Sequence, residues 1–253
     1  DVEYVISLYE IALQDYLSID LWSSYLHFFS VLYLKNVQNT MTGTEKGVGK
    51  SEEDVRALFE RALFGDAKLA FHASKSHLIW DQYKSFEENV LQVTDDPAKK
   101  QSQVKKLQDI YTRQLALPNL ELANAYESYE ETCEVLEQSP SEAIKTKFGE
   151  SMALMTQLAH YEERIASSQD ISNPDYTKLQ HWYEYINYEY ELKNHNRILV
   201  LYERALQYYF LVYNLWEDYI NYMVCHPLQL PTHQADSKGY AFIPDQVSVS
   251  QSR

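Results

Sequence analysis

A short phrase that recurs along the chain constrains its fold more than any other feature. It reads Leu-aromatic-Glu-Arg-Ala-Leu at 58–63 and at 201–206, with weaker copies at 8–13 and 110–115. A second phrase, a tryptophan followed by aromatic residues three and six positions later, alternates with the first. Its copies are Trp22-Tyr25-Phe28, Trp80-Tyr83-Phe86, Trp182-Tyr185-Tyr188 and Trp216-Tyr219-Tyr222, with Ala123-Tyr126-Tyr129 as a degenerate copy.

These spacings place each aromatic triplet along one face of a helix, where a neighbouring helix must cover it. Helix pairs that cannot bury their own stripe stack on one another, so the repeats predict an all-α solenoid of antiparallel helix pairs. The low content of 6 glycines and 7 prolines favours long helices. We expect helices at 2–17, 20–35, 52–65, 76–92, 98–116, 120–137, 141–168, 174–192, 195–210 and 212–225.

The repeats divide the chain into two regions. Residues 1–225 carry the alternating phrases and are interpreted as an array of about five repeats. Because Asp1 already lies inside a repeat phrase, we expect the chain to be a fragment, truncated at its N-terminus, of a longer protein. From residue 226 the periodicity ends and prolines recur, so 226–253 is predicted to be an irregular, disordered tail.

Composition excludes several classes of function. The formal net charge is −15, which is the wrong sign for a surface that neutralises phosphates and argues against direct binding of nucleic acid. An acidic solenoid favours basic partners, although negative charge also serves solubility. The 2 cysteines are too few for a disulfide framework and indicate a reducing, intracellular compartment. No stretch approaches the roughly 18 apolar residues of a membrane span.

The two phrases resemble those of the half-a-tetratricopeptide (HAT) repeat, whose first helix reads Trp-x-x-Tyr-x-x-aromatic-Glu and whose second reads aromatic-Glu-Arg-Ala-Leu. The first-helix ending is present at Phe86-Glu87, Tyr129-Glu130 and Tyr188-Glu189, and the second-helix phrase is complete from Phe59-Glu60-Arg61 and from Tyr202-Glu203-Arg204. The resemblance covers about residues 3–224 and implies a right-handed superhelix. Ile11 and Ala123 replace the expected Arg and Trp, so the first and fourth repeats are expected to pack less regularly.

HAT repeats are known chiefly from eukaryotic RNA-processing proteins, and the order of elements is similar to members that re-anneal the U4 and U6 small nuclear RNAs. The resemblance implies a non-enzymatic scaffold of pre-mRNA splicing in the nucleoplasm, which binds spliceosomal or snRNP proteins and ubiquitin-specific proteases. RNA is expected to bind only through regions outside this chain. Self-association belongs to later repeats, so dimerisation of this fragment is not expected. The alternative is a HAT scaffold for mRNA 3′-end formation or ribosomal RNA maturation.

No residue pattern indicates a catalytic, cofactor-binding or metal site. Gly43–Ser51 resembles a phosphate-binding loop, but its first glycine is one residue out of the required spacing and a helix precedes it, so it is interpreted as a linker. The histidine pairs, His72 with His77 and His226 with His233, lack cysteines at zinc spacing.

The charged pair inside the second phrase predicts a structural role. Glu60-Arg61 and Glu203-Arg204 recur beside aromatic residues that we expect to be buried. Each arginine is therefore expected to bridge to a first-helix glutamate such as Glu87 or Glu189, and to fix the angle between helices. The alternative is a weak, exposed ion pair. The pattern assigns no residue to a partner surface.

Overall fold

The computed structural model describes residues 2–15, 17–42, 49–166 and 174–226. Over these residues the chain forms ten α-helices and two short 3-10 turns, with no strand, which confirms the all-α fold. The helices are α1 (Val2–Ala12), α2 (Ile19–Thr42), α3 (Glu52–Phe64), α4 (His77–Val93), α5 (Pro97–Leu115), α6 (Leu122–Val135), α7 (Glu142–Ala166), α8 (Leu179–Glu191), α9 (His195–Tyr209) and α10 (Tyr213–Cys225), and the 3-10 turns are η1 (Leu69–Phe71) and η2 (Tyr176–Lys178).

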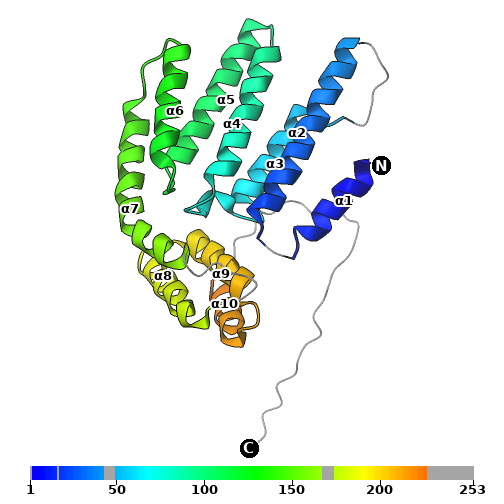
Figure 1. Ribbon diagram of the computed structural model, residues 1–253. Helices are drawn as coiled ribbons and strands as arrows, with labels where there is room; N and C mark the ends of the chain where they lie inside the picture. The colour runs from blue at the N-terminus through cyan, green and yellow to red at the C-terminus, as the bar shows by residue number, and fades with distance from the viewer. Residues whose placement is uncertain (1, 16, 43–48, 167–173, 227–253) are drawn as a thin grey trace, which may run out of the picture.

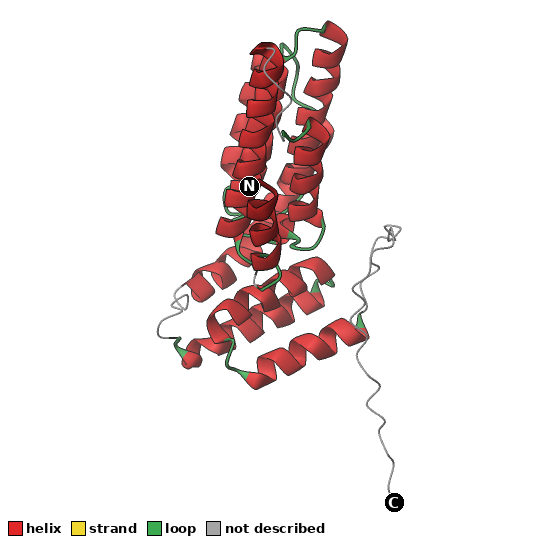
Figure 2. Cartoon of the chain, turned by 90° about the vertical axis from the view of Figure 1, so that its right-hand side faces the viewer, coloured by secondary structure: helices red, strands yellow, loops and turns green. Residues whose placement is uncertain are grey.

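The helices are stacked as the repeats require. Helices α2 to α7 follow one another from right to left as a row in Figure 1, and the turned view in Figure 2 shows that this row is two layers deep. Helix α1 lies at the right-hand edge of the row, and α8, α9 and α10 lie across its lower end (Figure 1). The aromatic phrase falls on the even-numbered helices from α2 to α10, which we term A helices. The aromatic-Glu-Arg phrase and its copies fall on the odd-numbered helices, which we term B helices.

Local sequence signals set several helix ends. Ser51 Oγ accepts a hydrogen bond from the Asp54 amide while the Asp54 carboxylate accepts one from the Ser51 amide, which forms a capping box at the start of α3. Pro97 begins α5, where a missing amide costs little. The largest difference from the predicted bounds is α2, which continues to Thr42 instead of ending at 35, because no Gly or Pro interrupts the chain before Gly43.

Buried side chains form three clusters that follow the chain. The first cluster lies mainly among α2, α3 and α4, the second among α5, α6 and α7, and the third mainly among α8, α9 and α10. Trp22, Trp80 and Trp182 are 2%, 1% and 0% exposed. Because indole rings bury more apolar area than other side chains, these three residues are major contributors to the free energy of the stack.

The array folds back on itself, so that α9 meets the segment between α3 and α4. Helix α9 contacts η1, and Val200 of α9 packs into the first cluster instead of the third. Arg204 Nη2 lies 3.4 Å from Ser74 Oγ, and the Gln207 side-chain amide donates to the Leu17 carbonyl. A solenoid whose repeats touch only their neighbours would not make these contacts.

Two predictions fall on residues outside the described ranges. Residues 43–48 of the glycine-rich segment and 227–253 of the expected tail are among them, so the linker and the boundary between array and tail stay predictions. Where the structure describes the chain, no helix has the length and apolar character needed to cross a membrane.

Candidate functional site

One contact recurs between successive B helices. In its first copy, Arg61 of α3 donates from Nη1 and Nη2 to the carboxylate oxygens of Glu10 in α1, both at 2.8 Å. Tyr25 of α2 donates its hydroxyl to the same carboxylate at 2.7 Å, and the Arg61 guanidinium lies 5.3 Å from the ring centre of Trp22. This planar, two-pronged pairing over an aromatic face suits arginine and not lysine.

The second copy links α5 to α3. Arg113 Nη1 lies 2.8 Å from both carboxylate oxygens of Glu60, and Tyr83 of α4 donates its hydroxyl to Glu60 at 3.1 Å. The guanidinium of Arg113 lies 5.8 Å from the ring centre of Trp80. The same four residue types therefore meet in the same arrangement one repeat later.

The third copy links α9 to α7 and is the most buried. Arg204 donates from Nη1 and Nη2 to Glu162 at 2.8 and 2.7 Å, and the two side chains are 4% and 3% exposed. Tyr185 also hydrogen-bonds Glu162, and Trp182 lies 5.6 Å from the guanidinium. Burial alone would raise the pKa of Glu162, but the charge and hydrogen bonds of Arg204 hold it below its ordinary value.

Aromatic stacking accompanies each copy. In α1, α3, α7 and α9 the aromatic residue of the B phrase lies face to face with the tyrosine of the next A helix, which aligns the two helices. The ring-centre distances are 4.7 Å for Tyr9 and Tyr25, 4.5 Å for Phe59 and Tyr83, 5.1 Å for Tyr161 and Tyr185, and 5.1 Å for Tyr202 and Tyr219.

Helix α6 departs from this pattern by three residues. Tyr129, and not Tyr126, faces Tyr111 of the preceding B helix, with ring centres 5.5 Å apart, while Tyr126 stacks on Phe148 at 4.2 Å. Ala123, which the sequence aligns with the tryptophans, is exposed. The glutamate position of α5 holds Thr112, so the Glu-Arg contact is not formed there.

The partners predicted for Arg61 and Arg204 are wrong. Glu87 receives hydrogen bonds from Arg56 at 2.8 and 3.0 Å, and Glu189 receives them from Arg197 at 2.8 Å. In antiparallel pairs the end of an A helix lies level with the beginning of a B helix. The arginine of the phrase lies five to seven residues further along, or about 8–10 Å at the rise of an α-helix, and reaches the preceding B helix instead.

Sequence reasoning therefore missed Glu10 and Glu162 as the partners of these arginines. The signal that identifies them is weak but present: Tyr9-Glu10 and Tyr161-Glu162 keep the aromatic-Glu half of the B phrase, although Ile11 and Glu163 stand at the position of its arginine. Tyr188, the third aromatic residue of the phrase on α8, also packs against α7. Its ring centre lies 5.0 Å from that of Tyr161, and its hydroxyl donates to Gln157 at 2.8 Å.

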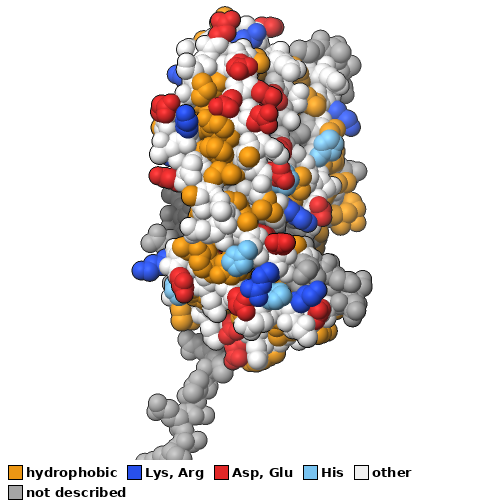
Figure 3. All heavy atoms as spheres, turned by 60° about the vertical axis from the view of Figure 1, so that its left-hand side comes forward, with side chains coloured by type: hydrophobic (Ala, Val, Ile, Leu, Met, Phe, Trp, Pro, Cys, Tyr) orange, Lys and Arg blue, Asp and Glu red, His pale blue; other side chains and the backbone are white. Residues whose placement is uncertain are grey.

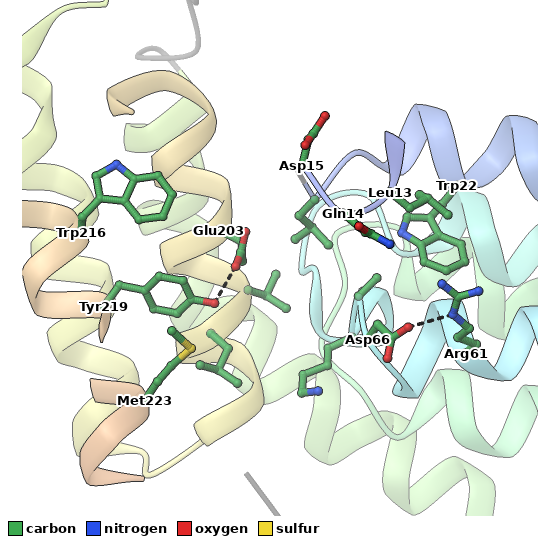
Figure 4. Close-up of a pocket in the computed structure, with 15 residues that line it drawn as sticks. Leu13, Gln14, Asp15, Trp22, Arg61, Asp66, Glu203, Trp216, Tyr219 and Met223 are labelled. Atoms are coloured by element: carbon green, nitrogen blue, oxygen red, sulfur yellow. Dashed lines mark hydrogen bonds and ion pairs between the residues drawn. The ribbon is translucent and has the colours of Figure 1, made fainter. Parts of the chain in front are cut away.

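A cavity of about 550 Å³ lies where the ends of the array approach one another (Figure 4). Glu203 of α9 and Tyr219 of α10 project from one wall, where the Tyr219 hydroxyl donates to Glu203 at 2.5 Å. Gln14 and Asp15 lie on the opposite wall, together with Arg61. The walls of the cavity therefore combine apolar side chains with the carboxylates of Asp15, Asp66 and Glu203.

Charges of both signs are distributed over the surface. On the face that includes the left-hand edge of the row, acidic side chains are interspersed with hydrophobic ones, and Lys and Arg occur singly or in small groups (Figure 3).

The histidines do not assemble a metal site within the described residues, where groups of three or more His, Cys, Asp or Glu with suitable geometry are not found. His72 is buried, and burial lowers its pKa well below the ordinary value. Its Nδ1 accepts a hydrogen bond from the Lys75 amide at 3.3 Å, which gives this ring a structural role in the segment after η1.

Comparison with known proteins gives the family. The family model described as Suppressor of forked protein (Suf) matches residues 1–249. Among curated proteins, the chain is 27% identical over 225 residues to the Mus musculus "Spliceosome associated factor 3, U4/U6 recycling protein" and 25% identical over 225 residues to the Homo sapiens protein of that name. The Danio rerio protein is 27% identical over 165 residues.

These alignments cover different shares of the two partners. They include 88% of this chain and 20% of the mouse and human proteins, and 61% of this chain and 16% of the zebrafish protein. The chain thus spans about a fifth of the length of the curated relatives it matches, or less.

Proposed function

Because the chain belongs to the Suppressor of forked family of helical-repeat proteins, we propose that it is a non-enzymatic, protein-binding scaffold of nuclear pre-mRNA splicing. It acts in reassembly of the U4/U6 snRNP. The observation that carries this proposal is the relation of 88% of the chain to U4/U6 recycling proteins, combined with a stack in which the charged contact that recurs from repeat to repeat joins helices to one another. Ubiquitin-specific proteases are further proposed partners.

The interhelix contacts support a scaffold and not an enzyme. The most deeply buried charged groups of the array, Glu162 and Arg204, are paired with one another, and the Arg204 guanidinium lies over the Trp182 ring. Groups held in this way fix helix angles and leave little freedom for proton transfer. Binding is left to exposed side chains on the helices and to the cavity between the two ends of the array.

An affinity capture experiment tests the proposed function. The chain, immobilised through a terminal tag, is incubated with nuclear extract from the source organism, with and without ribonuclease, and the bound proteins are identified by mass spectrometry. We expect U4/U6 snRNP proteins to be retained in both arms, because the contact is made by protein. Enrichment of factors for mRNA 3′-end formation or ribosomal RNA maturation would favour the alternative scaffold instead.

A calorimetric titration with purified proteins tests the proposed binding of a ubiquitin-specific protease. The N-terminal domains of a ubiquitin-specific protease are titrated into the chain and followed by calorimetry, with the catalytic domain of the same protease as the control. Saturable binding of the N-terminal domains alone is expected. Heat signals that are equal for the two protease fragments would contradict a specific interaction.

A further inference from the structure

Helices α9 and α10 carry an incomplete copy of the repeated contact. Glu203, Tyr219 and Trp216 occupy the positions held elsewhere by Glu162, Tyr185 and Trp182, and Tyr219 donates to Glu203 as its counterparts do. Among the described residues no arginine or lysine pairs with Glu203 or lies over the Trp216 ring. The three complete copies show what is missing, namely a guanidinium between the carboxylate and the indole.

The exposed face of α10 indicates the shape of the absent group. Trp216 is 40% exposed, whereas the other three tryptophans are at most 2% exposed. Tyr213, Ile220 and Val224 are 72%, 51% and 73% exposed. Together with Trp216 they follow one another at spacings of three and four residues, so they form one apolar stripe of the kind that another helix covers.

The cavity has room for this group, and the Glu203 carboxylate in it accepts the Tyr219 hydroxyl but has no cationic partner among the described residues. Glu203 and Trp216 both line it (Figure 4). The two cations of the cavity are engaged elsewhere: Arg61 pairs with Glu10 and Asp66, and Lys68 Nζ donates to the Gly65 carbonyl at 2.9 Å. A side chain that enters from outside can therefore pair with Glu203 without displacing an existing bond.

We propose that α10 and the adjoining cavity bind a helix of a partner protein that presents an arginine, with its guanidinium between Glu203 and Trp216 and its apolar residues on the stripe of α10. This rests on the proposed scaffold function and names the chemistry of one partner. The occupant is not a second copy of α1, because Ile11 stands at the arginine position of that helix. Residues 226–253 contain Arg253 but no aromatic-Glu-Arg phrase.

Peptide titration is the direct test. The probe is a fluorescent peptide with the sequence of residues 195–209, HNRILVLYERALQYY, blocked at both ends, and the matched probe carries glutamine in place of its second arginine. We expect the arginine probe to bind about tenfold or more tightly than the glutamine probe, because the charge-assisted pair is lost. Protection of Trp216 from acrylamide quenching should accompany binding, since the other tryptophans are already buried.

Two protein variants of equal charge identify the site. Glu203→Gln keeps an acceptor for Tyr219 but removes the charge, so binding of the arginine probe should weaken about tenfold or more. Glu217→Gln removes the same charge from an exposed position on α10 outside the cavity and should bind as the wild type does. Melting curves establish that both variants are folded.

Three results would overturn the proposal: equal affinity for the two probes, unchanged affinity of Glu203→Gln, or concentration-dependent self-association that blocks the probe. The capture experiment separates this proposal from the proposed function. If the wild type and Glu203→Gln retain the same splicing proteins in equal amounts, the scaffold stands and the arginine site fails. If the wild type retains none, the scaffold fails whatever the probes show.

Discussion

At the residue scale, loss of the Arg204–Glu162 pair should lower the free energy of unfolding more than loss of either of the other two copies of this contact. Both side chains are almost fully buried, and the two-pronged geometry stacked on Trp182 cannot be reproduced by an ammonium group. We expect Arg204→Lys to lower the free energy of unfolding by about 1–3 kcal/mol. Urea denaturation followed by circular dichroism measures the change.

The matched control is Arg164→Lys. Arg164 pairs with Glu184 at 2.5 Å, but these side chains are 38% and 36% exposed, so the substitution should cost less than about 1 kcal/mol. Equal effects of the two substitutions would mean that burial of the Arg204 pair contributes nothing beyond a surface ion pair.

Glu10 should make stability depend on pH. The hydrogen bond from Arg61 lowers the pKa of Glu10 in the folded chain. Since the unfolded pKa is about 4.3, the ionised carboxylate stabilises the fold fully above that pH, and this stability is lost as pH falls through the folded pKa. Glu10→Gln should therefore flatten the loss of stability below about pH 4.3 relative to the wild type.

Thermal melting from pH 3 to pH 7 measures this difference, with Glu131→Gln as a control that removes one exposed carboxylate of α6. The control should keep the acid slope of the wild type. If Glu10→Gln also keeps that slope, the Arg61 contact does not couple to protonation.

Residue types and spacings predicted which side chains form contacts between helices, but not which residues pair with one another. The phrases place Arg61 and Arg204 on B helices beside aromatic residues, as found. Their carboxylate partners depend on how far one helix slides along another, which is set by packing of side chains such as Tyr9 on Tyr25. That information is not local in the sequence, so Glu87 and Glu189 were predicted where Glu10 and Glu162 are found.

At the scale of elements, the helices were predictable because each carries its own period, caps and breaks. The shifted register of α6 was not, because Leu122 and Ala125 are buried and bring Tyr129 to the inner face, whereas the aromatic spacing favours Ala123. The contact of α9 with η1 was also unpredicted, since the segment after α3 has no repeat phrase.

Helix α9 should hold the two ends of the array together through Val200, which is 2% exposed and packs among the residues of α2, α3 and α4. We expect Val200→Ala to cost about 1–3 kcal/mol through lost methyl contacts and the cavity left behind. Hydrogen exchange should rise in η1 as well as in α9.

The neighbouring substitution Leu201→Ala is the control. Leu201 is equally buried but belongs to the cluster of α8, α9 and α10, so its loss should raise exchange in those helices first. If both variants loosen the same helices, the contact between α9 and the first cluster carries no separate energy.

At the scale of the whole molecule, the charge of −15 should exclude RNA as a direct ligand of this chain. The main basic segment is the exposed face of α5, where Lys99, Lys100, Lys105 and Lys106 lie. Four phosphate contacts would give weak binding that falls by about two orders of magnitude between 50 and 200 mM salt. We therefore expect no saturable binding of a U4/U6 RNA duplex at about 150 mM salt in fluorescence anisotropy.

A variant with glutamine at the four lysine positions is the control. Any RNA binding that the wild type shows at 50 mM salt should be absent in this variant. Tight RNA binding that persists at 150 mM salt, or that remains after the four lysines are replaced, would show that the array itself binds RNA. The hypothesis that this chain binds only proteins would then be rejected.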